Sequence, residues 1–394
     1  MKEWNIQYQE LLEMEDRSYC LIDIRDEAST AYGMIPGAQW IPAEQLQQKL
    51  KKEDAKKIIL YCIRGALSEE YAELLRESGY EAYSLEGGYT RWLIERMEAE
   101  QKKEETDSDE DIQRAQEIEA SIRKKFHKKL FSRFAKAIRD YELVQEGDKI
   151  AVCISGGKDS MLLAKLFQEL KKHNKFPFEV EYLVMDPGYS ELNRKLLEQN
   201  ARMMGIPIKI FESDIFDAVF DVEKSPCYLC ARMRRGHLYS KAKELGCNKI
   251  ALGHHYDDVI ETILMGMLYG AQVQTMMPKL HSTNFEGMEL IRPLYLVRED
   301  DIKHWRDYNG LHFLQCACKF TETCSTCSAD GSSASKRMEI KHLIAKLKET
   351  NPYVEGNIFK SVENVNLSTV IAYKEHGVKH HFLEKYDATP SDAF

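Results

Sequence analysis

The feature that most constrains this chain is a strand, a short glycine loop and a helix in direct succession between residues 148 and 167. Residues 148–154 form an apolar run typical of a buried strand, and residues 161–167 have helical character. Two adjacent glycines let the loop backbone approach an anion, and Lys158 adds a positive charge where the helix presents its first N–H groups. The sequence therefore predicts a phosphate site formed by Ser155, Gly156, Gly157, Lys158, Asp159 and Ser160.

Three further apolar runs alternate with helical segments and extend this unit into a parallel sheet. They cover residues 179–186, 206–211 and 249–253. The third run leads into His254, His255 and Asp258, and side chains at the carboxyl end of a parallel strand face a bound nucleotide. Asp159 and Asp258 are suitable ligands for a Mg²⁺ ion that bridges phosphates. His254 is assigned to the same nucleotide site, with a purely structural hydrogen-bonding role as the alternative.

The size and composition of the chain predict a multidomain globular protein. Its 394 residues suggest two or three domains, and a hydrophobic content of 43% excludes wholesale disorder. No apolar run approaches the roughly 18 residues that cross a bilayer, and the first residues do not resemble a signal peptide. We therefore expect a cytoplasmic protein without a membrane partner. In that compartment the ten cysteines indicate metal binding or thiol chemistry rather than disulfides.

One of these cysteines, Cys62, follows a predicted strand directly. The apolar runs 21–25 and 57–61 are each followed by a turn or helix, which predicts a small parallel α/β sheet. Cys62 lies on the loop between the second run and the helical segment 69–75, next to Arg64. A helix N-terminus and a nearby cation favour the thiolate, and the same loop is suited to a persulfide anion.

The charge distribution changes sign abruptly near residue 120. Residues 98–119 contain ten Asp or Glu and three Lys or Arg, which is typical of a solvated helix or a flexible connector. Residues 121–139 contain eight Lys or Arg and no acid, with apolar residues at helical spacing. This pattern predicts an amphipathic basic helix, either a solvated surface helix or one that docks a polyanion through residues such as Lys128 and Lys129.

A C-x-x-C pair precedes three arginines. Cys227 and Cys230 are followed by Arg232, Arg234 and Arg235, so two thiolates and a dense positive patch lie together in the sequence. This combination fits a metal centre that faces an anionic polymer. Further candidate ligands come later, at Cys316, Cys318, Cys324 and Cys327. Structural zinc is the alternative to an iron–sulfur centre.

The first hundred residues resemble the rhodanese family. Three segments carry the resemblance: residues 21–26 match its first strand and acidic turn, residues 33–38 its G-H-I-P-G-A turn, and residues 85–92 its closing L-x-G-G-x-x-x-W motif. The resemblance implies that Cys62 carries sulfane sulfur as a persulfide. The loop departs from the common pattern at Ile63 and Leu67, where arginine is frequent in the family. The alternative is a rhodanese fold used only for docking.

Residues from 121 to about 370 resemble the tRNA 2-thiocytidine synthetase family of PP-loop ATP pyrophosphatases. The resemblance rests on the order of the motifs at 155–160, 227–236, 253–262, 269–270, 277–280 and 291–294. It implies adenylation of an anticodon-loop cytidine, position 32, at C2 by ATP and Mg²⁺, followed by sulfur insertion through a [4Fe-4S] cluster. Lys158 and Asp159 are then catalytic. Cys227, Cys230 and Cys316 are the implied cluster ligands, with Cys324 as the rival for the third.

These resemblances lead to one expected architecture and several open alternatives. We expect an α/β protein with a small rhodanese-like parallel-sheet domain at 1–100, a connector and basic helix at 101–139, a Rossmann-like PP-loop domain at 140–380 and a tail at 381–394. Expected partners are tRNA and a sulfur donor such as a cysteine desulfurase, with a homodimer left open. The alternatives are thiolation of another tRNA base or of a small metabolite, and a zinc-stabilised ATP-binding module.

Overall fold

The computed structural model describes residues 4–14, 18–30, 33–50, 57–104, 108–173, 176–189, 191–213, 226–313, 336–384 and 386. The chain divides into two compact units. The first is Met1–Tyr256 with Met277–Ser333, and the second is Asp257–Met276 with Ala334–Phe394. Within the described ranges, no helix is long and apolar enough to span a membrane.

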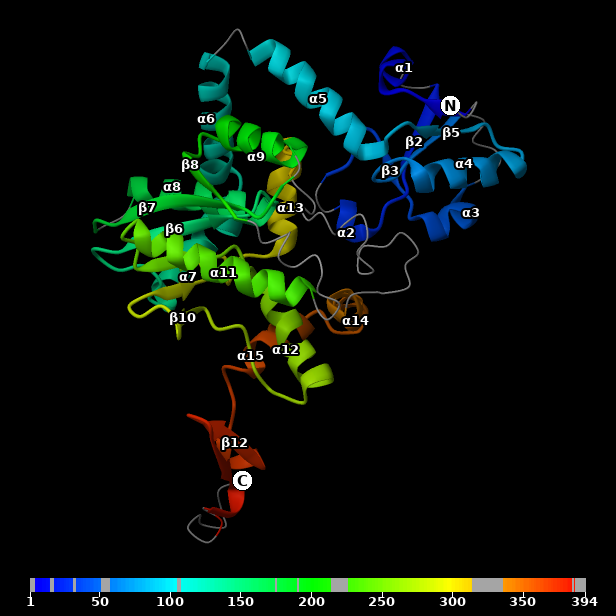
Figure 1. Ribbon diagram of the computed structural model, residues 1–394. Coiled ribbons are helices and arrows are strands. Elements are labelled where there is room, and N and C mark those ends of the chain that lie inside the picture. Colours follow the sequence, from blue (N-terminus) through cyan, green and yellow to red (C-terminus); the bar gives the residue numbers. More distant parts are fainter. Residues whose placement is uncertain are drawn as a thin grey trace. The chain divides into compact units, whose positions relative to one another are not determined.

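The N-terminal sheet of the first unit is parallel and has the strand order β1-β5-β4-β2-β3. Its strands are β1 (Asn5–Ile6), β2 (Tyr19–Asp23), β3 (Gln39–Trp40), β4 (Lys57–Tyr61) and β5 (Ala82–Leu85). Its helices are α1 (Tyr8–Glu13), α2 (Glu27–Thr30), α3 (Leu46–Lys49), α4 (Ala66–Glu77) and α5 (Gly88–Glu104). Residues 58–61 of the central strand β4 are all buried, as expected for a parallel strand covered on both faces. Helix α4 packs against β4 and β5 (Figure 1).

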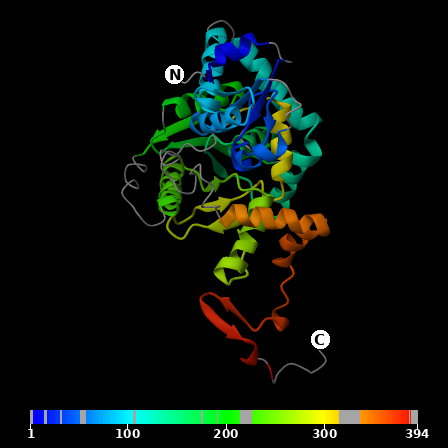
Figure 2. The same cartoon turned by 90° about the vertical axis from the view of Figure 1, so that its right-hand side faces the viewer.

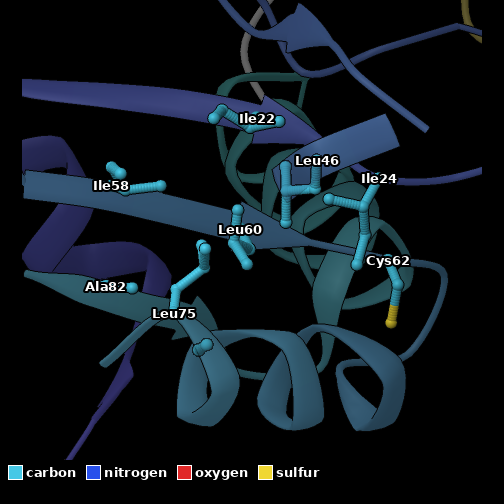
Figure 3. Packing of buried hydrophobic residues seen from close by; sticks show 9 residues of the cluster. Ile22, Ile24, Leu46, Ile58, Leu60, Cys62, Leu75 and Ala82 are labelled. Carbon is cyan, nitrogen blue, oxygen red and sulfur yellow. The ribbon is translucent and has the colours of Figure 1, made fainter. Parts of the chain in front are cut away.

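The hydrophobic core of this sheet leads directly to Cys62. Because side chains alternate along a strand, Ile58, Leu60 and Cys62 belong to the same face, and they share one core cluster with Leu75 of α4 (Figure 3). Cys62 stands at the end of this row, beside the start of α4. The packing that orders the strand therefore also fixes the position of the cysteine.

The second sheet has the strand order β10-β11-β9-β6-β7-β8 and is parallel except for β10. Its strands are β6 (Lys149–Ile154), β7 (Glu179–Asp186), β8 (Ile208–Glu212), β9 (Lys249–Ala251), β10 (Lys279–His281) and β11 (Glu289–Ile291). The chain runs outward from β6 to β8 and then returns to β9 on the other side of β6 (Figure 1). Such a reversal is a topological switch point, where open α/β sheets bind their ligands. The predicted phosphate loop follows β6 and lies at this point.

Helices α6 (Ser108–Lys124), α7 (Ser132–Asp140), α8 (Lys158–His173), α9 (Glu191–Met203), α11 (Pro226–Glu244) and α13 (Glu299–Tyr308) accompany the second sheet. All residues from Met161 to Phe167 in α8 are buried, and the buried Lys165 places its Nζ 2.9 Å from Glu119 Oε1 of α6. This ion pair fixes the end of the acidic segment to α8. The expected α/β architecture is confirmed.

The predicted basic helix is not a single regular α-helix. After α6 ends at Lys124, a π-helical turn occupies His127–Phe131 and α7 follows. The apolar residues recur every four positions and are all buried: Ile122, Phe126, Leu130, Phe134 and Ile138. In a helix with 3.6 residues per turn, side chains exactly four residues apart move gradually around the helix axis. The wider π turn compensates for this rotation and keeps them on one face. The predicted amphipathic helix is therefore two α-helices joined by a π turn, and its buried apolar face is confirmed.

The second unit contains the helices α12 (Tyr256–Gly270), α14 (Lys336–Thr350) and α15 (Val354–Ser361). Tyr256, the first residue of α12, still belongs to the first unit. Helices α14 and α15 pack against each other. The antiparallel hairpin of β12 (Ala372–Glu375) and β13 (Val378–His381) follows, and its two strands lie side by side in Figure 2, where they are red.

Candidate functional site

Cys62 occupies the turn between β4 and α4 and is only 6% exposed. The backbone N–H of Gly65 donates to its sulfur at 3.1 Å, and the Ser68 hydroxyl donates at 3.6 Å. Gly65 is the N-cap of α4 and has a φ of 98°, in the left-handed region that favours glycine. Two donors and a helix N-terminus therefore surround the sulfur, an arrangement that stabilises a thiolate or a persulfide.

The glycine pair before α5 closes this loop. A Cβ on Gly88 would collide with the carbonyl oxygen of Cys62 and lie 2.9 Å from Gly65 N, so only glycine fits. The next two N–H groups bind the loop: Tyr89 N donates to Cys62 O at 2.9 Å, and Thr90 N donates to Ile63 O at 3.0 Å. The closing motif thus holds the cysteine turn in shape.

The predicted phosphate loop connects β6 to α8 and begins with a tight turn. Gly156 has a φ of 83°. The Ser160 hydroxyl accepts from Ser155 N at 3.1 Å and donates to Gly157 O at 3.0 Å. A Cβ on Gly253 would lie 3.1 Å from Ser160 N, so the segment after β9 packs directly against the loop. A glycine turn at the N-terminus of a long helix is suited to binding phosphate.

Lys158 is buried between two carboxylates. Its Nζ lies 3.1 Å from Asp159 Oδ2 and 3.2 Å from Glu299 Oε1, at the first residue of α13. Glu299 was not among the residues predicted from the sequence. Three consecutive acids open α13, and acids are common in the first turn of any helix, so no local signal distinguishes Glu299.

Asp159 has one carboxylate oxygen that no hydrogen bond satisfies. Its Oδ1 is buried and has no hydrogen-bond partner in the part of the chain that the structure describes. The Nε2 atom of His255 is 3.9 Å from this oxygen and therefore beyond hydrogen-bond distance. Leaving a buried carboxylate oxygen unsatisfied is costly, and a hard cation bound to it removes that cost. The residues at this position therefore fit the expected Mg²⁺.

The two residues after β9 that were assigned to the ATP site fall in different units. His254 lies between β9 and α12 in the first unit. Asp258 lies in the second unit, where its Oδ1 is 3.2 Å from Arg337 Nη1, and Glu261 Oε2 is 3.2 Å from Arg337 Nε. This pairing with α14 was not predicted from the sequence. The assignment of His254 and Asp258 to ATP stays a prediction.

A pocket with basic walls lies beside α7 in the first unit. Its volume is about 310 Å³, and it is lined by Arg133, Lys136, Tyr256, Leu296 and Arg298. The Arg298 guanidinium stands 5.0 Å from the centre of the Tyr256 ring. Cations and an aromatic face together are suited to a phosphodiester with an attached base. Only the basic helix was predicted; Tyr256 and Arg298 come from other segments.

The other predicted RNA-binding residues lie on helix surfaces. Lys128 is exposed, and Lys129 places its Nζ 3.0 Å from Asp301 Oδ1. On α11, Arg232 and Arg235 are exposed, and Arg234 Nη2 lies 3.5 Å from Tyr189 OH. Four of the five cations are thus exposed, and Arg234 is the exception. Polyanion binding requires such exposure.

The predicted cluster ligands lie largely outside the described residues. The backbone of α11 places Cys227 and Cys230 three positions apart in its first turns, whereas their side chains and the whole of Cys316, Cys318, Cys324 and Cys327 are not described. Among the residues that are described, no group of three or more His, Cys, Asp or Glu could hold a metal ion. Two other cysteines are core residues, and burial raises the pKa of Cys153 to about 12 and of Cys247 to about 11.

Fold and loops together define a sulfurtransferase-type architecture, a rhodanese-like domain followed by a PP-loop domain. The rhodanese-like domain family matches residues 7–95 and the PP-loop domain family matches residues 124–318. The chain belongs to the tRNA-cytidine(32) 2-sulfurtransferase family, which confirms the resemblance found in the sequence. The relative from Anaeromyxobacter sp. (strain K) is 34% identical over 245 residues, which cover 61% of this chain and 80% of that protein. The relative from Geotalea uraniireducens (strain Rf4) is 33% identical over 250 residues, with coverages of 62% and 95%.

Solved structures with similar folds include the U34-tRNA thiolase NcsA from Methanococcus maripaludis with its [4Fe-4S] cluster. It is 23% identical, has a TM-score of 0.48, and covers 60% of this chain and 78% of that chain. A rhodanese-related protein from Thermoplasma volcanium is 27% identical with a TM-score of 0.22, and covers 23% of this chain and 92% of that chain.

Proposed function

We propose that this enzyme thiolates C2 of cytidine 32 in tRNA at the expense of ATP, with sulfur supplied through a persulfide on Cys62. The observation that carries the proposal is the phosphate loop at the switch point of the second sheet. There the buried Lys158 pairs with Asp159 Oδ2, while Asp159 Oδ1 has no hydrogen-bond partner among the described residues. The named function of the relatives supports the same reaction.

The C2 oxygen of cytosine is a poor leaving group, so it must be activated before sulfur can replace it. Attack of this oxygen on the α-phosphate of ATP would transfer AMP to the base and release pyrophosphate. The loop N–H groups and Lys158 are arranged to stabilise the charge that develops on the departing pyrophosphate. Asp159 Oδ1 would hold a Mg²⁺ ion, which supplies further charge neutralisation to the phosphates.

Glu299 is proposed to position Lys158 within the loop. The carboxylate 3.2 Å from Nζ would pair with the buried ammonium and fix its direction before ATP binds. A lysine held in this way needs little reorganisation when the phosphates arrive.

Sulfur would be carried on Cys62, loaded by an external donor such as a cysteine desulfurase. The Gly65 N–H and the Ser68 hydroxyl, which already face the sulfur, would stabilise the persulfide anion. Two further electrons, from a thiol reductant, are required to bring sulfane sulfur to the level of the thiocarbonyl.

Cys227, Cys230 and Cys316 are proposed as the ligands of a [4Fe-4S] cluster, with Cys324 as the rival for the third position. Two thiolates three positions apart at the start of α11 suit cluster ligation, because the positive helix end favours their anionic form. A cluster with three protein ligands supplies an open iron at which sulfur can bind.

The tRNA backbone is proposed to contact the basic pocket and the cations of α11. Arg133, Lys136 and Arg298 surround Tyr256, so a phosphate and a stacked base could be bound together. The arginines of α11 follow the proposed cluster ligands directly, and bound RNA would therefore lie near the sulfur chemistry.

Nucleoside mass spectrometry of tRNA tests this proposal. A deletion strain of the source organism should lack 2-thiocytidine, and the wild-type gene should restore it while a Lys158→Ala gene should not. Loss of a different thionucleoside would favour another tRNA base as the acceptor. An unchanged set of thionucleosides would contradict tRNA thiolation and favour a small metabolite or a zinc-stabilised ATP-binding module.

A further inference from the structure

The His312 side chain connects the segment after α13 to the rhodanese-like part of the first unit. Its Nδ1 lies 3.3 Å from Tyr89 OH, and its ring meets the Trp92 ring edge-on with 5.2 Å between centroids. A Cβ on Gly33 would lie 2.8 Å from the same Nδ1, so the glycine leaves the space that the imidazole fills. Three residues from the rhodanese motifs thus surround one histidine from the PP-loop part.

A single buried arginine holds two of these three residues in place. Arg25 donates to Gly33 O at 2.7 Å, and its guanidinium stands 4.0 Å from the centre of the Tyr89 ring. Arg25 is itself fixed by Asp23 at 2.6 Å, with both side chains buried. The receiving site for His312 is therefore preorganised rather than formed by flexible surface side chains.

The backbone around His312 is anchored on the opposite side. Asn200 Nδ2 of α9 donates to His312 O at 2.9 Å, and Asn309 Nδ2 donates to Ser121 Oγ of α6 at 3.1 Å. Arg114 also donates to Asn309 O. The flanking Leu311 and Phe313 are buried. His312 is therefore presented by a rigid segment and not by a flexible loop end.

Tyr89 links this contact to the persulfide loop. Its hydroxyl contacts His312, while its backbone N–H donates to Cys62 O at 2.9 Å. In the other direction, the first of the later cysteines, Cys316, follows His312 by four residues in the sequence. One histidine thus stands between the cysteine that is proposed to carry sulfur and the segment of sequence that contains a proposed cluster ligand.

The imidazole is neutral in this environment. Burial, together with the nearby charges of Arg96, Arg306 and Arg25, lowers the pKa of His312 to about 3. An uncharged ring can stay in place beside three arginines throughout the physiological pH range.

We propose that His312 is a positioning residue that docks the rhodanese-like part onto the PP-loop part, so that sulfur passes from Cys62 to a thiolate of the same chain. This inference rests on the proposed function. In the transfer the acceptor thiolate attacks the outer sulfur of the persulfide, the S–S bond at Cys62 breaks, and Cys62 leaves as a thiolate. A new S–S bond forms on the acceptor, and no electrons are gained or lost overall.

The test compares two sulfur sources in tRNA thiolation by the purified full-length protein. Thiosulfate delivers sulfur through Cys62, whereas inorganic sulfide bypasses it. We expect His312→Ala to lower thiosulfate-supported thiolation by about tenfold, because docking raises the effective concentration of the donor, and to leave sulfide-supported thiolation within about twofold. Thiosulfate-to-cyanide transfer, which needs only the Cys62 loop, should not change. Undiminished thiosulfate-supported thiolation, or an equal loss with both sources, would overturn the proposal.

Matched variants separate docking from local damage. His304 is exposed on the neighbouring α13, and His304→Ala should behave as wild type in every assay. Gly33 and Gly37 both have positive φ in the same turn, yet a Cβ on Gly37 meets nothing within 4 Å. Gly33→Ala should therefore reproduce the loss seen in His312→Ala, and Gly37→Ala should not. Equal effects of the two glycine variants would point to backbone strain and contradict docking.

A second measurement needs no tRNA and is independent of the base that is modified. Radiolabelled sulfane sulfur is loaded onto Cys62, and peptide mapping locates the label after incubation. In the wild type the label should reach cysteines outside residues 1–100, and in His312→Ala it should stay on Cys62. Transfer at equal rates in both proteins would contradict the docking role even if tRNA thiolation were confirmed. If the label moves only in the wild type while no tRNA is thiolated, the docking role holds and the proposed tRNA substrate fails.

Discussion

Lys158 and Glu299 are far apart in the sequence, yet Nζ of the lysine lies 3.2 Å from Oε1 of the glutamate, with both side chains largely buried. The pair joins the phosphate loop to the start of α13. A buried ammonium needs carboxylate partners to offset its lost hydration, and Glu299 provides the second one beside Asp159.

Lys158→Ala should lower tRNA-dependent pyrophosphate release by about 100-fold, because one preorganised charge at the leaving group is lost. Glu299→Gln should lower pyrophosphate release by about tenfold, since glutamine keeps the shape of the side chain and removes the charge that holds Lys158 Nζ. The matched control is Asp300→Asn, whose side chain is 68% exposed. An equal loss in Asp300→Asn would show a general charge effect and remove the specific role of Glu299.

Cys62→Ser should abolish thiosulfate sulfurtransferase activity and leave ATP-dependent pyrophosphate release intact, because the two loops follow strands of different sheets. Cyanide-dependent thiocyanate formation measures the first activity. Cys20→Ser is the control, since Cys20 packs beside the core away from the loop. Full sulfurtransferase activity in Cys62→Ser would refute the persulfide assignment. In cells the loss of thiolation should be partial wherever free sulfide reaches the enzyme.

Anaerobically purified Cys227→Ala and Cys230→Ala should each lose the brown colour of an iron–sulfur cluster, and only one of the later cysteines should behave in the same way. Three protein thiolates complete a cluster with an open iron, and we expect the third to be Cys316. Visible absorption and iron analysis give the result. Loss of iron in Cys324→Ala with retention in Cys316→Ala would shift the assignment to the later pair. If all the later cysteines are needed, zinc should be found beside iron.

Arg133→Ala and Arg298→Ala should each weaken tRNA binding and reduce the slope of log K against log salt concentration by about one, because each removes one phosphate contact. Filter binding measured at salt concentrations from about 50 to about 200 mM provides the slopes. Lys171→Ala, an exposed lysine in the last turn of α8, should leave the slope unchanged. Unchanged slopes in both arginine variants would exclude the pocket as a tRNA contact.

The folded protein should lose stability as the pH falls below about 6.5, in part through His312. Burial and nearby arginines lower the pKa of His312 from 6.5 to about 3, so in this window the unfolded chain binds a proton that the folded chain does not. Between pH 7 and pH 5 this difference amounts to about 2 kcal/mol of unfolding free energy. Urea unfolding, followed by tryptophan fluorescence, should show this pH-dependent loss in the wild type and a smaller one in His312→Gln. The exposed His304→Gln variant should keep the wild-type dependence.

The chemistry-bearing loops could be predicted from the sequence because each is a contiguous stretch. The strand before Cys62, the glycine pair at 87–88 and the phosphate loop at 155–160 have local requirements: apolar alternation, positive φ and a helix start. Such requirements restrict which residue types can stand next to each other in the sequence, so the sequence motif predicts the local backbone structure. The same holds for the buried apolar face of the segment 122–138, although its π turn was not foreseen.

Only the tertiary structure decided which distant groups pair with these loops. The contacts of Lys158 with Glu299, of Asp258 with Arg337, and of His312 with Tyr89 each join segments that the sequence leaves far apart. An acid, an arginine or a histidine has many candidate partners along a chain, and packing decides which of them come within 3 to 4 Å. The sequence by itself determined what each loop can bind, because that depends on local backbone geometry. The fold determined the charge, orientation and docking of the side chains around each loop, because those depend on which surfaces are buried together.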